Sequence, residues 1–77
     1  STMATRRWSL TYPTKLIKEP VLYRVAKDFK LVPNIRKARV TETTGEVLVD
    51  FSGKEEDLKK GLNYLTGLGI TVKEVQG

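Results

Sequence analysis

The spacing of hydrophobic residues changes along this chain, and the order of those changes limits the folds open to it. Residues 7–12 alternate between apolar and polar side chains, which is typical of a half-buried strand. After Glu19-Pro20 the apolar residues recur every three to four positions, which predicts an amphipathic helix that ends near Lys30 or Leu31. Proline suits the start of that helix because its missing backbone donor would be unpaired there.

The middle of the chain is expected to form a hairpin. A second extended segment covers residues 35–43, and Thr44-Gly45 supplies the turn into a third at 46–52. In the third segment every second residue from 47 to 51 is apolar, so one face is predicted to be buried.

A second helix is predicted over residues 54–66, followed by a last strand at 70–75. The leucines of this helix recur at helical spacing, and three acidic residues stand in its first turn, where the helix dipole favours them. Gly61 lies inside the apolar stripe, which indicates a close approach to the sheet. Gly67 or Gly69 is expected to end the helix.

This order of elements predicts an α+β fold, the ferredoxin-like βαββαβ sandwich, with a four-stranded antiparallel sheet and two helices on one face. Right-handed crossovers would place the first and third strands at the centre, parallel to each other, with the second and fourth at the edges. The chain has 77 residues, room for one domain, which we place at residues 6–77. Residues 1–5 are expected to be a tag remnant and a disordered N-terminus.

The composition argues against catalysis. The sequence has no cysteine and no histidine, so it lacks disulfides, thiol chemistry, the usual zinc ligands and the commonest proton-transfer group. No nucleophile, base and orienting group can be combined from the remaining residues. We therefore expect no catalytic residue, no metal and no cofactor. The apolar runs are too short for membrane insertion, and a cytoplasmic location fits the absence of cysteine.

Basic residues give the chain a formal net charge of +5 and suggest a second kind of function. A basic patch on the uncovered sheet face would comprise Arg7, Lys37, Arg39 and Lys73, beside Arg36. Such a face would suit an adaptor that binds nucleic acid or an acidic protein, or it would simply deter edge-to-edge aggregation. Nucleic acid is disfavoured, because the uncovered side of the third strand carries Glu46 and Asp50 instead of stacking rings.

The aromatic side chains allow two interpretations. They could line a ligand pocket or pack in the core, and their positions beside apolar stripes favour packing. The residues concerned are Trp8, Tyr12, Tyr23 and Tyr64.

From Glu19 onward the sequence resembles the NIL domain, a ferredoxin-like module attached to the ATPase subunits of methionine-type ABC importers and also found in stand-alone or ferredoxin-linked proteins. The matching residues are Glu19-Pro20, Phe29, Val32-Pro33-Asn34-Ile35-Arg36, Gly45, Val47, Val49, Phe51, Gly53, Tyr64-Leu65 and Gly69-Ile70. The signature after which the domain is named reads Asn-Ile-Leu. Here Arg36 replaces its leucine, and Ala38 stands where glycine is common.

The resemblance implies a regulatory module that binds methionine or another small amino acid and pairs with a second copy, or acts beside a transporter or ferredoxin-type partner. Its binding residues are expected at Asn34, Ile35, Arg36 and Ala38. An asparagine offers both donor and acceptor, and an arginine pairs well with a carboxylate. The alternative for Asn34 is a purely structural role in a turn, and for Arg36 a role as an exposed surface charge.

Overall fold

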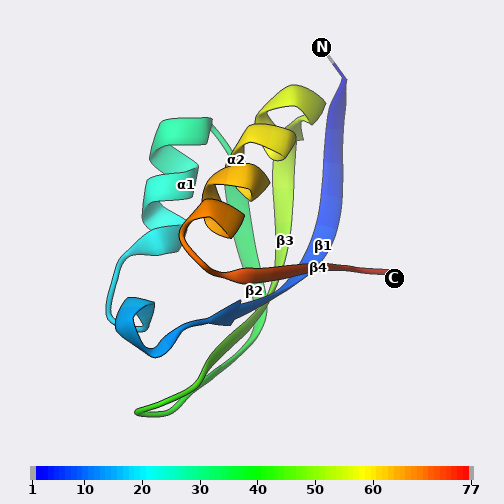
Figure 1. Cartoon of the computed structure of the whole chain (residues 1–77). Helices are drawn as coiled ribbons and strands as arrows, with labels where there is room; N and C mark the ends of the chain where they lie inside the picture. Colours follow the sequence, from blue (N-terminus) through cyan, green and yellow to red (C-terminus); the bar gives the residue numbers. More distant parts are fainter. Residues whose placement is uncertain (1, 77) are drawn as a thin grey trace.

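The computed structural model describes residues 2–76 and has the predicted order of elements (Figure 1). The sheet order is β2-β3-β1-β4, and both helices cover the same face of the sheet. This confirms the predicted ferredoxin-like fold. The elements are β1 (Met3–Tyr12), a short 3-10 turn (Thr14–Leu16), α1 (Val21–Phe29), β2 (Val32–Val40), β3 (Gly45–Lys54), α2 (Glu55–Gly67) and β4 (Thr71–Val75).

The two central strands run in opposite directions. β1 pairs antiparallel with β3 on one side and with β4 on the other. The prediction that the first and third strands are parallel is therefore wrong. Each helix joins two parallel strands that have a third strand between them, β1 with β2 and β3 with β4. The hairpin reverses β3 relative to β2, and so relative to β1.

The first strand begins inside the segment that was expected to be a tag remnant and disordered. Met3, Ala4 and Thr5 are paired with the last residues of β3, and the carbonyl of Thr2 accepts a 2.9 Å hydrogen bond from the backbone N–H of Glu55. The expectation of disorder does not hold for these residues, because β3 is as long as β1 and pairs with it over its full length. Ser1 lies outside the described residues.

The hairpin also differs from its predicted limits. β2 begins at Val32, which places Pro33 within an edge strand, where a missing donor is tolerated. The turn precedes Gly45: the Thr41 backbone N–H donates to the Thr44 carbonyl at 2.8 Å, and the Thr41 hydroxyl accepts from the backbone N–H of Thr44 at 2.9 Å. β3 then starts at Gly45 itself.

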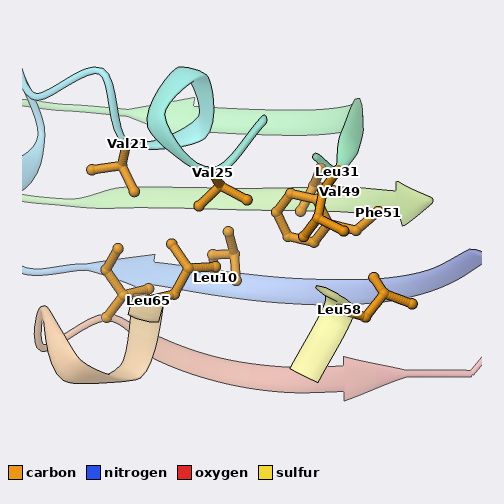
Figure 2. Close-up of a cluster of buried hydrophobic side chains, with 9 residues drawn as sticks. Leu10, Val21, Val25, Leu31, Val49, Phe51, Leu58 and Leu65 are labelled. Carbon is orange, nitrogen blue, oxygen red and sulfur yellow. The ribbon is translucent and has the colours of Figure 1, made fainter. Parts of the chain in front are cut away.

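The core lies between the sheet and the two helices (Figure 2). Phe51 is its largest fully buried side chain. The other members are Leu10, Val21, Val25, Leu31, Val49, Leu58, Leu65 and Ile70. Trp8, Tyr12 and Tyr64 pack against this core as predicted, and the Tyr64 ring lies 5.2 Å from that of Phe29. Tyr23 does not, because its side of α1 faces solvent and it is 64% exposed.

Gly61 allows a close approach between α2 and the end of α1, and not between α2 and the sheet as predicted. A Cβ atom at Gly61 would lie 2.7 Å from a methyl of Leu31, which follows α1, and 3.7 Å from Val25 and Phe29. A Cβ atom at Gly53 would lie 2.6 Å from the other methyl of Leu31. Leu31 therefore occupies the space left by two glycines, and α2 can approach the end of α1.

Candidate functional site

A bulge in β2 decides which signature residues share a face. Asn34 lies opposite Asp50 and Ile35 opposite Val49, but Lys37 lies opposite Leu48, so Arg36 is an extra residue in the ladder. Because Val49 belongs to the core, Ile35 shares the face that the helices cover, and Asn34 shares the open face.

The four residues predicted from the family signature are therefore split between the two faces. Asn34 and Arg36 lie on the open side, where Arg36 reaches Asp50. Ile35 and Ala38 lie on the helix side; Ala38 is opposite Val47, which packs against the core. Of the four predicted residues, the structure thus brings only Asn34 and Arg36 together on one face.

Asp50 is the centre of a polar cluster on the open face. The guanidinium of Arg7 donates to both of its carboxylate oxygens, at 2.8 and 3.3 Å. The Arg36 guanidinium lies 3.9 Å from the same carboxylate, an ion pair that is too long for a hydrogen bond. The side chain of Asp50 is only 15% exposed, whereas that of Arg36 is 49% exposed. Among residues 2–76, the Asn34 side chain has no hydrogen-bond partner.

The electrostatics of the cluster keep Asp50 ionised. The hydrogen bonds from Arg7 lower the pKa of Asp50 most, the charges of Arg7 and Arg36 lower it further, and partial burial opposes both effects. The cluster therefore presents the ionised carboxylate of Asp50, the amide of Asn34 and the half-exposed guanidinium of Arg36. Such a set can hold a molecule that carries both a cationic and an anionic group.

An acid titration tests this account of Asp50. A carboxyl whose pKa is lowered by folding stabilises the folded state above its unfolded pKa, and this stabilisation is lost as pH falls through the folded pKa. We expect Asp50→Asn to be less stable than the parent at pH 7, and the difference to shrink below about pH 4. Urea unfolding at several pH values measures this, and a difference that stays constant with pH would contradict the assignment.

The predicted basic residues do share the open face, but their charges are interrupted. Arg7 is paired with Asp50, Arg39 lies opposite Glu46, and Lys73 lies opposite Ser9 on β1. The open-face positions of the two central strands carry no aromatic ring. They are Met3, Thr5, Arg7, Ser9 and Thr11 on β1 and Glu46, Leu48, Asp50, Ser52 and Lys54 on β3. This arrangement offers no platform on which bases could stack.

An apolar cleft that the sequence did not predict lies on the helix-covered side of the sheet. It has a volume of about 210 Å³ and lies between the segment that joins β1 to α1 and the turn end of the hairpin. Its lining includes Tyr12, Ile17, Tyr23, Val40 and Val47. Burial raises the pKa of the Tyr12 phenol, as expected for a ring against an apolar wall. The signal for this cleft in the sequence is Ile17, an apolar residue between the first predicted strand and the first predicted helix.

Comparison with known proteins decides the family. The model of the NIL domain matches residues 6–74, nearly the whole chain. The chain belongs to the NIL-domain family. This NIL domain is 32% identical over 62 residues to the Methionine import ATP-binding protein MetN 1 of two strains of Listeria monocytogenes. The match covers 75% of this chain but only 18% of those proteins.

Solved structures agree on the fold of this NIL domain. The C-terminal domain of an ABC transporter ATP-binding protein from Enterococcus faecalis superposes with a TM-score of 0.79 at 12% identity, covering 94% of this chain and 84% of that one. The de novo designed protein Foldit4 superposes with a TM-score of 0.58 at 9% identity, covering 99% of both chains. A designed protein shares the architecture, so any function must be argued from the site.

Proposed function

We propose that this NIL domain is a non-enzymatic regulatory module that binds an amino acid on the open face of its sheet. The observation that supports it is the placement of Asn34 and Arg36 around the ionised Asp50. A free amino acid carries a carboxylate for the Arg36 guanidinium and an ammonium group for Asp50 and the Asn34 carbonyl. Leu48 lies two residues from Asp50 on the same face and is half-buried, so it offers an apolar surface for the ligand side chain.

Methionine is the first ligand to test. The curated relatives are named for methionine import, and their aligned segments are related to this chain. In this proposal the domain acts in the cytoplasm, as a homodimer or beside a transporter or ferredoxin-type partner, and ligand occupancy changes that association. The alternative is an adaptor that binds nucleic acid or an acidic protein across the whole open face. It has less support because Glu46 and Asp50 on β3 separate the basic residues of β2 from those of β1 and β4.

A thermal-shift titration with L-methionine and other amino acids tests the proposal. A ligand at 100 times its dissociation constant adds about 2.7 kcal/mol of stability. In a domain of this size that corresponds to a rise of roughly 10–20 °C in the unfolding midpoint. We expect one amino acid to produce a saturable rise, and Asn34→Ala or Arg36→Ala to abolish most of it.

Arg39→Ala is the matched control, because it removes a guanidinium from the same strand and face without touching Asp50. It should leave the shift intact. A flat response across the whole amino-acid panel would refute the proposal, as would an equal loss of response in all three variants.

A further inference from the structure

The free edge of β2 is the most exposed apolar part of the molecule. β2 has a neighbour on one side only, and every residue in it except Pro33 is exposed. Among the described residues, three of the five exposed large hydrophobic side chains belong to it: Val32, Ile35 and Val40. An edge of this kind leaves a row of backbone N–H and C=O groups without partners in the sheet.

The half of β2 after the bulge has two chemically different sides. Ala38 and Val40 lie on the helix side, and Val40 lines the apolar cleft together with the exposed ring of Tyr23. On the open side, Lys37 and Arg39 project from alternate positions. Residues 32–40 contain basic side chains and no acidic one. The edge is thus apolar on one side and cationic on the other.

We propose that residues 37–40 of β2 bind an extended peptide segment of a partner protein whose side chains alternate between apolar and acidic. The segment adds a fifth strand to the sheet through backbone hydrogen bonds, as in other cases of strand addition. Its apolar side chains lie on the helix side, one of them in the cleft of about 210 Å³. Its carboxylates lie opposite Lys37 and Arg39, because successive side chains of a strand point to opposite faces.

Charge distinguishes this occupant from a second copy of the chain. Two β2 strands paired with each other would bring their basic side chains together, and like charges directly opposite each other destabilise a strand pair. Pro33 and the bulge at Arg36 further disrupt pairing along the first half of the edge. Past the bulge the register with β3 is regular, so the backbone at 37–40 is suited to accept a strand.

This surface is separate from the polar cluster around Asp50, so the proposal does not depend on an amino-acid ligand. Its test is a labelled synthetic peptide of about nine residues, the length of β2, in which valine and glutamate alternate. Binding is followed by fluorescence polarisation, and the site by backbone amide NMR. We expect saturable binding that perturbs the amides of residues 37–40 and of Tyr23.

Two control peptides isolate the two sides of the edge. A peptide of the same composition with its valines and glutamates in separate blocks, and one in which lysine replaces glutamate, should both bind at least about tenfold more weakly, because they lose the alternation or reverse the charge. Equal binding of the blocked peptide would overturn the proposal. So would perturbations centred on β4 or on Asp50.

A charge-reversal variant distinguishes the loss of a specific contact from a general loss of folding, because it should bind one of the two peptides more tightly. Lys37→Glu combined with Arg39→Glu should weaken the valine–glutamate peptide about tenfold and strengthen binding of the valine–lysine peptide. Lys73→Glu, which makes one such charge reversal on the other edge strand, should leave both affinities unchanged. The proposal fails if the double variant does not bind the valine–lysine peptide more tightly than the parent chain does. It also fails if the parent chain is a dimer whose β2 amides are already protected from exchange.

Discussion

A Phe51→Ala variant is expected to lose about 3–5 kcal/mol of its free energy of unfolding. Phe51 lies on the central strand β3, is 0% exposed and is the largest fully buried side chain of the core (Figure 2). A 77-residue domain has a total stability of roughly 4–12 kcal/mol. The variant should therefore be marginally stable or unfolded at 25 °C. Urea unfolding, followed by circular dichroism and by the fluorescence of Trp8, measures the loss.

Leu48→Ala is the control for Phe51→Ala. Leu48 is on the same strand but on the open face, where it is only half-buried, so truncation removes fewer contacts and leaves no closed cavity. We expect less than half the effect of Phe51→Ala. Equal losses for the two variants would mean that the core is not organised around the helix-covered face.

A Leu31→Ala variant is expected to lose about 2–5 kcal/mol of its free energy of unfolding. It should also change the effect of a second substitution, Gly61→Ala, from neutral or destabilising to stabilising. Leu31 is 2% exposed, and its two methyl groups occupy the space above Gly53 and Gly61. In the parent chain, alanine at position 61 would place a Cβ atom 2.7 Å from Leu31, so the gain in helix propensity of about 1 kcal/mol is offset by the clash. Once Leu31 is shortened, the clash disappears and the new methyl fills part of the cavity.

A double-mutant cycle measures this dependence. We expect Gly61→Ala to be neutral or destabilising in the parent and stabilising in the Leu31→Ala background, with a coupling energy of about 0.5–3 kcal/mol. The control is Gly67→Ala, because a Cβ atom at Gly67 would meet nothing within 4 Å. Its effect should be the same in both backgrounds. Additive effects of Leu31→Ala and Gly61→Ala would contradict the packing described for Leu31.

The order of elements could be predicted because it depends on local patterns. The alternation in β1 and β3 and the helical spacing in α1 and α2 are each set by which side of the element is buried. The direction of the central strands follows from the same order of elements, because the crossover through α1 makes β2 parallel to β1 and the hairpin then reverses β3. The predicted parallel direction was wrong because it left out this reversal in the hairpin.

The candidate site was only partly predictable, because of the bulge at Arg36. Adjacency in the signature suggested that Asn34, Ile35, Arg36 and Ala38 act together. In the structure the extra residue shifts the alternation, so Asn34, Lys37 and Arg39 share the open face and Ala38 does not. The sequence predicted Asp50 only as an acidic residue on the uncovered face of the third strand. Its pairing with Arg7 and Arg36 could not be predicted, because these residues are distant from it in the sequence.

NMR titration of the ¹⁵N-labelled chain with L-methionine shows whether Asn34, Arg36 and Asp50 bind an amino acid. We expect saturable amide shifts concentrated at these three residues and Leu48, with much smaller shifts for the methyl ester, which lacks the carboxylate that Arg36 would bind. An unchanged spectrum at high methionine concentration, or shifts centred instead on Tyr12, Tyr23 and Val40 around the apolar cleft, would contradict it.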